Sequence, residues 1–491
     1  MNFGHGGVFF KRNPRKLSLQ LPAIDMQKSA TTESARKWWT LAVVGSGSFM
    51  AALDGSVVNV ALPIIGRTTH SAISTVEWVI LVYYIVISAS LLVFGRLADI
   101  HGKRVIYMAG QLGFVFGSLC CALAGSIGFL IAARAIQAVG AAMIFALSPA
   151  ILISAFPANE RGRALGLQAT LTYLGLAIGP GLGGILTQHF GWPAIFYINL
   201  PIGLGMWFMA NKTLPPGEKS EGQPFDPVGA LSLAVALSAL LLVLSKGGDW
   251  GWGNPPIAGL AVLAAGAGFV FVRTERRSAH PALDFGLFRD RRFTASVLAA
   301  YLCYLSMAAV SFLLPFYLLS AAGYSASRAG AVLMAVPLVM IGVTGPSGIF
   351  SDKVGVRLPA TIGMAVMAAG LFLLGGLRPE HGAGHIAACL AVVGVGVGMF
   401  TAPNNSAIMG SVPKNRQGVA GALLAAARTV GFASGVAIAG LIYTAVLGGR
   451  HDSAAPEDIA RAVRAGMRII AGFALAGAAC SLLRGTRRSE T

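Results

Sequence analysis

Apolar runs long enough to form a membrane-crossing helix recur along this chain, and few of them contain a charged residue. A helix needs about 20 apolar residues to cross roughly 30 Å of hydrocarbon. The 491 residues are 55% hydrophobic and only 11% charged, which excludes an ordinary soluble protein. The 63 glycines and the scarcity of alternating segments favour a helix bundle over a membrane β-barrel. We therefore predict an all-α, multi-pass membrane protein.

Runs bounded by charges or by Pro and Gly clusters predict fourteen spans. They begin near Leu41, Trp78, Val105, Gly128, Ala164, Ala194, Val228, Ile257, Ala295, Ala329, Pro359, Ile386, Val419 and Ala465. The seventh and eighth spans, over residues 228–245 and 257–272, are the shortest. If both lay on the membrane surface, the chain would have twelve spans and one long central linker.

The distribution of positive charge predicts the orientation. Most of the 37 Lys and Arg residues fall in the termini and in the loops on the same side as the termini. The positive-inside rule therefore predicts a cytoplasmic (inner) membrane protein with both termini in the cytoplasm. This bias, with attraction to membrane lipid, explains the net charge of +18 without a nucleic-acid partner. Because the first residues lack a signal-peptide core, we expect an uncleaved tail, with Met26 as an alternative start to Met1.

Cofactor and metal motifs are not found in the sequence. The five cysteines lie in apolar runs without the spacing of metal ligands or of paired outer-loop positions. Gly102 and Lys103 are followed by Arg104 and lack the upstream glycine of a phosphate-binding loop. We expect no cofactor, no metal and no enzyme activity, so the energy source would be an ion gradient or the substrate gradient.

Asp54 places a carboxylate inside the apolar run from Trp38 to Ile65. Because an ionised acid in hydrocarbon is costly, an intramembrane carboxylate is a functional-site candidate that is either paired or carries a proton. Arg134, in the fourth span, lies at a compatible depth, and Gln137 is one turn away. We predict that Asp54 takes a proton from outside and releases it inward, while a substrate competes for the site. The alternative is a static Asp–Arg pair that joins the first and fourth helices.

Two turns of similar sequence indicate an internal repeat. GRLADIHGKR follows the second span and GIFSDKVGVR follows the tenth. Paired repeats let a transporter rock two halves around a midplane site. In a closed gate, the acid of the turn would accept hydrogen bonds from a facing helix start; the alternative is a short solvated turn. The candidate gating residues are Gly95, Asp99, Gly102, Lys103, Arg104, Asp352 and Arg357.

These turns resemble the cytoplasmic loop signature of the major facilitator superfamily. LDGSVVNVALP, at residues 53–63, resembles the first-helix signature of its fourteen-helix drug:proton antiporter branch. Ser56 stands where this first-helix signature usually has Thr, and Ala138 stands where the family's fourth-helix signature usually has Gly, but both keep a small side chain. Further similar strings are RAIQAVGAAM, GLAIGPGLGG, IFYINLPIG, FDPVGAL, HPALDFGLFRDRRF and GYSASRAGAVLMAVP.

The resemblance implies both an architecture and a function. The architecture is the major facilitator fold with 14 helices: a cytosolic tail over 1–37, a six-helix bundle over 38–211, a two-helix insert over 212–292, a second six-helix bundle over 293–484 and a tail over 485–491. The implied function is proton-coupled export of hydrophobic or cationic drugs or antibiotics by alternating access, performed by a monomer.

A glycine-rich string in the fifth span is similar to a motif of the family's exporters. Glycines four residues apart flatten a helix face, and a proline removes a backbone hydrogen bond and permits a bend. We expect a hinge or a tight seam that seals the cavity; ordinary helix packing is the alternative. The residues are Gly175, Gly179, Pro180, Gly183 and Gly184.

Other polar residues in the spans are weaker candidates. Arg428, Asn404 and Asn405 are candidates to line the cavity. The alternatives are snorkelling or a phosphate contact for Arg428 and interhelical hydrogen bonds for the two Asn. Glu77, at the start of the second span, is expected to be a solvated acid.

Several other functions stay open at this point. The chain can export an endogenous metabolite or a self-made antibiotic. An uptake permease of the same fold is disfavoured by the glycine string. A membrane sensor or enzyme is disfavoured because the sequence shows no soluble domain, nucleophile elbow or metal-binding cluster.

Overall fold

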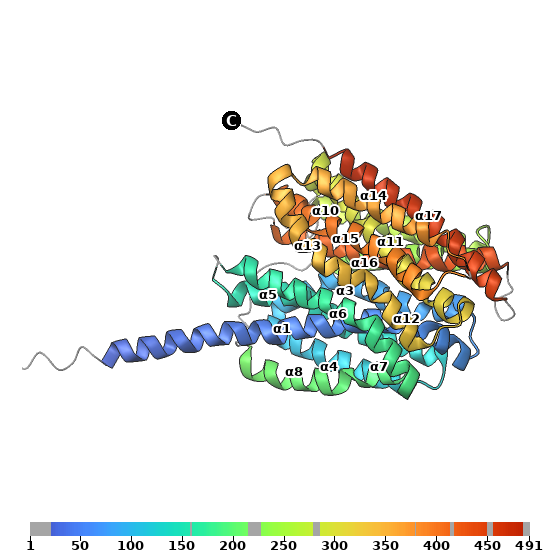
Figure 1. Ribbon diagram of the computed structural model, residues 1–491. Coiled ribbons are helices and arrows are strands. Elements are labelled where there is room, and N and C mark those ends of the chain that lie inside the picture. The colour runs from blue at the N-terminus through green and yellow to red at the C-terminus, as the bar shows by residue number, and fades with distance from the viewer. Residues whose placement is uncertain are drawn as a thin grey trace, which may run out of the picture.

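The computed structural model describes residues 21–157, 160–214, 227–277, 285–378, 380–412, 417–448 and 455–484. Every regular element in these ranges is a helix. In Figure 1 the blue-to-green helices of the N-terminal part lie together below the yellow-to-red helices of the C-terminal part. The predicted all-α class is confirmed.

The helices fall into a first half, an insert and a second half. The first half is α1 (Leu21–Thr68), α2 (Ile73–Val76), α3 (Trp78–His101), α4 (Lys103–Ala122), α5 (Ile127–Ala155), α6 (Arg161–Phe190), α7 (Ala194–Tyr197) and α8 (Asn199–Thr213). The insert is α9 (Pro227–Trp250) and α10 (Pro255–Arg277). The second half is η1 (Phe285–Arg289), α11 (Arg291–Phe316), η2 (Tyr317–Ala321), α12 (Ala326–Leu333), α13 (Ala335–Val354), α14 (Arg357–Leu374), α15 (Ala383–Gly410), α16 (Gln417–Leu447) and α17 (Pro456–Leu482).

The number of membrane-spanning helices agrees with the sequence prediction. Within the described ranges, 13 stretches of helix have the length and apolar composition needed to cross a membrane. At the seventh predicted span, α9 contains a shorter apolar stretch, Leu231–Gly247. Together these account for the fourteen predicted spans. The first helix is longer than predicted, because α1 already begins at Leu21 within the expected tail.

The two halves repeat one packing scheme. In the first half, α1 packs on α6, α3 and α4 both pack on α5, and α4 also packs on α8. In the second half, α11 packs on α16, α13 and α14 both pack on α15, and α14 also packs on α17. Helices at matching positions along the chain therefore have matching neighbours, which supports the internal repeat inferred from the two similar turns.

Both of those turns depend on a glycine with positive φ. Gly102 ends α3 with a φ of 94°, and Gly355 ends α13 with a φ of 84°. Residues with a Cβ rarely adopt this conformation, whereas glycine adopts it readily. Each turn therefore reverses the chain within one or two residues. Gly95 differs, because an added Cβ there would contact nothing within 4 Å.

The two halves meet at one end of the bundle. We call the end that holds the α1–α2 connection the distal end and the opposite end the proximal end. At the distal end, Arg67 Nη2 donates to Ser320 Oγ at 3.0 Å and the Ser327 amide donates to Gln188 Oε1 at 3.0 Å. At the proximal end, the Lys37–Glu160 ion pair, 2.6 Å long, joins two helices of the first half.

The insert is attached to both halves. Its helix α9 packs against α3 of the first half and α16 of the second half, and α10 packs on α9. The tail over 485–491 and residues 1–20 of the other tail lie outside the described residues.

Candidate functional site

The structure brings Asp54, Arg134 and Gln137 into one buried cluster, as their depths predict. Arg134 Nη1 donates to Asp54 Oδ2 at 2.5 Å and to Gln137 Oε1 at 2.6 Å. Gln137 Nε2 donates to Asp54 Oδ1 at 2.8 Å, and so does Asn199 Nδ2, also at 2.8 Å. Every one of these side chains is at most 1% exposed. The carboxylate therefore receives three donors from α5 and α8.

Two members of this cluster are absent from the sequence prediction, Asn199 and Ser118. The Ser118 hydroxyl accepts from Gln137 at 2.7 Å and from Asn199 at 3.3 Å. The same hydroxyl donates a hydrogen bond to the Phe114 carbonyl oxygen at 2.8 Å. A signal for Asn199 exists in the sequence, because it is an isolated amide in the apolar string IFYINLPIG. Ser118 gives no such signal, since serine is common in membrane helices.

Arg134 is held from the side opposite the acid as well. Its Nε donates to the Val79 carbonyl at 3.0 Å, and its guanidinium carbon lies 4.1 Å from the centre of the Tyr83 ring. The Phe196 ring is 5.8 Å away. Cation–π contacts of this kind are strongest when they are shielded from water. The guanidinium is therefore fixed by an acid, an amide, a backbone carbonyl and two aromatic rings.

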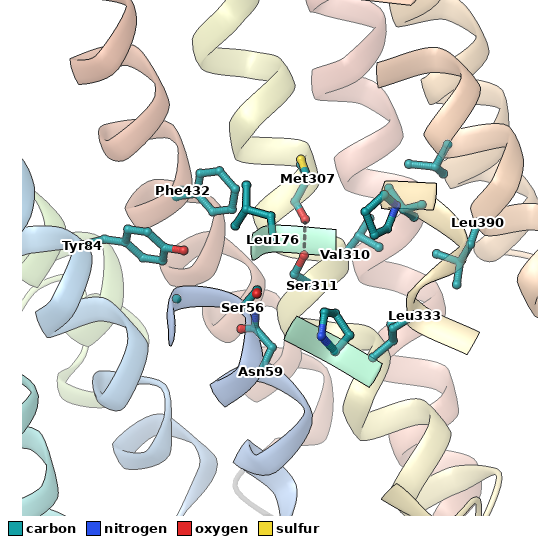
Figure 2. A pocket seen from close by; sticks show the side chains of 15 residues that line it. Ser56, Asn59, Tyr84, Leu176, Met307, Val310, Ser311, Leu333, Leu390 and Phe432 are labelled. Carbon is teal, nitrogen blue, oxygen red and sulfur yellow. Dashed lines mark hydrogen bonds between the residues drawn. The ribbon is translucent and has the colours of Figure 1, made fainter. Parts of the chain in front are cut away.

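The second feature is a pocket between the halves (Figure 2). Residues of α1, α3 and α6 line it from the first half, and residues of α11, α12, α13, α15 and α16 line it from the second half. Tyr84 and Phe432 stand on one side of it and Leu333 and Leu390 on the other. No acidic residue is among the described residues that line this pocket. Its wall is mainly apolar, as is typical of small-molecule sites.

Asp54 does not line the pocket, although its neighbours on α1 do. Gly55, Ser56 and Asn59 face the pocket, whereas Asp54 points to α5 and α8 inside the first half. In this conformation a substrate in the pocket does not touch the carboxylate. The helix α1 therefore carries the acid on one face and pocket residues on another.

Aromatic rings form one wall of the pocket. The Tyr84 and Phe432 rings stack with centroids 5.2 Å apart and an interplanar angle of 25°. Tyr304 lies 6.0 Å from Phe432 at 30°. Arg428 is one helical turn before Phe432 on α16, and its guanidinium carbon lies 5.9 Å from the Phe145 ring. Arg428 therefore lies one turn from a pocket residue and close to α5 of the first half, but it is not among the described residues that line the pocket.

The glycine-rich string of α6 contacts two different helices. An added Cβ at Gly175 would lie 2.4 Å from the Phe49 carbonyl oxygen, and one at Gly179 would lie 1.8 Å from Ser56 Oγ. A Cβ at Gly183 would lie 2.6 Å from the Val57 carbonyl oxygen. These three glycines let α6 pack closely on α1.

The other face of the string touches the second half. A Cβ at Gly184 would lie 2.3 Å from the Ala326 carbonyl oxygen, and a Cβ at Gly330 would lie 2.3 Å from the Pro180 carbonyl oxygen. We call this distal contact of α6 with α12 the distal seam. Helices approach this closely where one of the two residues in contact is a glycine.

The predicted gating turns form no contact between the halves in the described part of the chain. Arg104 Nη2 donates to the Asn211 carbonyl at 2.7 Å and to Asn211 Oδ1 at 2.9 Å, within the first half. Lys103 and Arg357 are half-buried at the starts of α4 and α14. The side chains of Asp99 and Asp352 lie outside the described residues.

The two predicted Asn residues do not line the central pocket. Asn404 is fully buried, and its Oδ1 accepts from Arg484 Nη2, while Asn405 is half-buried. Arg484 also donates to Ser481 Oγ at 3.1 Å. Burial lowers the pKa of Arg484 to about 10, so this guanidinium is still charged at neutral pH. Asn404 therefore follows the alternative expectation of a bond between helices.

Glu77 is buried, and the expectation of a solvated acid is wrong. Its side chain is 1% exposed, and Oε1 accepts from Ser245 Oγ of α9 at 2.6 Å. An added Cβ at Gly440 of α16 would lie 1.7 Å from Glu77 Oε2. The sequence misleads here because α9 and α16, which come far later in the chain, cover the start of α3.

Known proteins of similar sequence are transporters. The chain is 35% identical over 403 residues to "Riboflavin transporter RibZ" of Clostridioides difficile, covering 82% of this chain and 87% of that protein. It is 31% identical over 432 residues to "Multidrug resistance protein Stp" of Mycobacterium tuberculosis, covering 87% and 80%. It is 30% identical over 415 residues to "Tetracenomycin C resistance and export protein" of Streptomyces glaucescens, covering 84% and 77%.

Solved structures and a family profile agree with these similarities. The fold matches a bacterial homologue of the human lysosomal transporter Spinster in an inward-facing, unoccupied conformation, with a TM-score of 0.69, 15% identity and coverage of 91% of this chain and 97% of that one. The profile of the Major Facilitator Superfamily matches residues 44–436 and 296–490. The chain is a multi-pass membrane transporter and belongs to the major facilitator superfamily.

Proposed function

We propose that this protein is a proton-coupled antiporter that exports hydrophobic small molecules across the cytoplasmic membrane. The observation that carries the proposal is the double role of α1, which holds the buried acid on one face and pocket residues on another. A change at Asp54 is therefore transmitted to the pocket through one rigid helix. Coupling needs no contact between the proton and the substrate.

Two different arrangements of the halves provide alternating access. In the proposed orientation both termini and the proximal end face the cytoplasm, and the distal end faces outward. The distal seam between α6 and α12 then closes the outer side, and the protein faces inward. The gating turns at the proximal end would meet in the opposite, outward-facing state.

Proton movement follows from the donors around Asp54. Its Oδ1 accepts from both Gln137 and Asn199, so a proton on this oxygen would displace one of these two donors. The displaced group must find a new partner, and α5 or α8 shifts against α1. An elementary charge that crosses about 100 mV supplies roughly 2.3 kcal/mol, which a pH gradient supplements. This energy would drive export against a concentration gradient.

Reconstituted vesicles test the coupling. With an imposed pH gradient, the wild type is expected to accumulate a neutral, planar, fluorescent dye such as riboflavin, and a protonophore abolishes this accumulation. Asp54→Asn is expected to lose gradient-driven accumulation while keeping dye exchange at equal pH. Asp458→Asn, which alters an acid in a surface ion pair with Arg461, is the matched control. An Asp54→Asn protein with undiminished proton coupling would exclude the proton-carrier role and favour the static pair.

A second candidate is export of an endogenous planar metabolite or a self-made antibiotic. The similarity to a riboflavin transporter and to a tetracenomycin C export protein favours it. A gene-deletion strain separates the candidates: drug sensitivity supports multidrug export, and intracellular build-up of one native compound supports metabolite export. Loss of growth on an external nutrient would instead indicate an uptake permease. We further propose a monomer, which light scattering of the purified protein tests.

A further inference from the structure

Arg428 is a cation inside a membrane-spanning helix without an acidic partner among the described residues. Its guanidinium carbon lies 5.9 Å from the centre of the Phe145 ring, and its side chain is half-buried. Its charge is near enough to interact electrostatically with the phenols of Tyr84 and Tyr304. An unpaired charge at membrane depth is costly, and such residues mark substrate pathways. Arg428 therefore requires a partner that the described protein does not supply.

No acid near the pocket balances this charge. Asp54 is bonded inside the first half, Glu77 is buried at the distal end against α9 and α16, and Glu275 is buried near the end of α10 in the insert. None of these three acids lines the pocket. The local charge at the pocket is positive, which disfavours the cationic substrates expected from the resemblance.

The pocket also offers a flat surface at a fixed distance from this charge. Arg428 and Phe432 are four residues apart on α16, so their side chains lie on the same helix face about 6 Å apart along the axis. Phe432 stacks with Tyr84 and lies beside Tyr304. On α1, Asn59 supplies an amide at the same pocket. A planar ring against this wall would bring an attached anionic group to the guanidinium.

We propose that Arg428 forms an anion subsite of the transport pocket and that the substrates are planar aromatic molecules carrying a carboxylate or another anionic oxygen. This inference rests on the proposed transport function and names its substrate class. Guanidinium binds such oxygens through two parallel, charge-assisted hydrogen bonds. Neutral planar molecules with carbonyl groups bind more weakly, and planar cations bind least.

Two dyes that share one ring system test the charge preference. Fluorescein is anionic and rhodamine 123 is cationic, and both contain a xanthene. Their affinities for the full chain in phosphatidylcholine nanodiscs are measured by fluorescence anisotropy. The wild type is expected to bind fluorescein more tightly than rhodamine 123. Arg428→Gln is expected to weaken fluorescein binding about tenfold, as the loss of one charge-assisted bond implies, and to leave or improve rhodamine 123 binding.

Two control variants separate the subsite from a general charge effect. Arg428→Lys keeps the charge but not the two-pronged geometry, and it is expected to restore part of the fluorescein affinity. Arg328→Gln removes an exposed arginine that stacks on Tyr324 at the distal end, 4.2 Å from the ring centre, and it should leave both affinities unchanged. Equal loss in Arg328→Gln and Arg428→Gln would overturn the subsite.

Lipid phosphate is the other source of an anion for Arg428. If lipid occupies it, Arg428→Gln leaves both dye affinities at their wild-type values and lowers the phosphatidylglycerol retained by the purified protein, and the subsite is excluded. The binding assay needs no pH gradient. Failure of the gradient assay therefore leaves the subsite standing, whereas equal dye affinities in the wild type overturn the subsite alone.

Discussion

Arg134 of the first half and Arg428 of the second half both lie within membrane-spanning helices, but their surroundings are opposite. Arg134 is fully buried and bonded to Asp54, Gln137 and the Val79 carbonyl. Arg428 is half-buried, and in the described part of the chain its contact is an aromatic ring. The first guanidinium is saturated by its own half, whereas the second is left open beside the pocket.

This difference indicates that the two arginines have different roles in the protein. A saturated pair holds helices together and changes only when a proton or a conformational step breaks it. A guanidinium without an acidic partner keeps N–H donors that can bind a ligand. The two charges are therefore expected to respond differently to substitution: changes around Arg134 should alter stability and coupling, and changes at Arg428 should alter ligand choice.

The largest expected effect is the loss of stability when the Asp54–Arg134 pair is broken. Asp54→Ala leaves the Arg134 guanidinium buried without its acid, and breaking a buried pair in this way costs about 3–5 kcal/mol. We expect a lower melting temperature in detergent. The Asp54→Leu/Arg134→Met double variant removes both charges and should recover much of that loss. Arg428→Gln should change unfolding by less than about 0.5 kcal/mol. Equal destabilisation by Asp54→Ala and Arg428→Gln would break the comparison.

The buried acid Glu77 tests whether a hydrogen bond to a buried acid also stabilises the protein outside the Asp54 cluster. Ser245→Ala removes the hydroxyl that donates to Glu77 at 2.6 Å. A hydrogen bond to a charged group contributes about 1.5–3 kcal/mol. The melting temperature should fall, because α9 loses its attachment to the start of α3. Ser311→Ala is the control, since this hydroxyl bonds the Met307 carbonyl of its own helix at 3.0 Å. An unchanged Ser245→Ala protein would show that this hydrogen bond does not hold the insert against α3.

The distal seam gives the next effect. A valine at Gly184 would bring its Cβ within 2.3 Å of the Ala326 carbonyl oxygen, and overpacking of this kind costs about 1–3 kcal/mol. The cost applies only while the seam is closed, so Gly184→Val should shift the protein toward the outward-facing state. Labelling of a cysteine placed at Asn59 should then become faster from outside. Gly166→Val, where nothing lies within 4 Å of an added Cβ, is the control.

Much of this architecture is predictable from sequence, because each span is recognised from local hydrophobicity. The similar depths of Asp54 and Arg134 are predictable too, from the helix rise, but their direct ion pair is not. What sequence cannot supply is the direction in which each side chain points. Asn199 joins the acid while Asn404 bonds Arg484, although both are isolated amides in apolar runs. Glu77 is buried because α9 of the insert and α16 of the second half pack over it. These outcomes depend on contacts between distant segments.

The smallest expected effect is a change in ligand affinity at the aromatic wall near Arg428. If the wall beside Arg428 binds planar ligands by stacking, Tyr84→Phe should leave fluorescein affinity nearly unchanged, because the ring remains over Phe432. Tyr84→Leu removes the ring, and a stacked pair contributes about 0.5–1.5 kcal/mol. Its dissociation constant should therefore rise by roughly 2- to 12-fold. Anisotropy titrations in the same nanodiscs compare the two variants. Equal losses for Tyr84→Phe and Tyr84→Leu would mean that the hydroxyl, and not the ring, recognises the ligand, because both variants lack the hydroxyl.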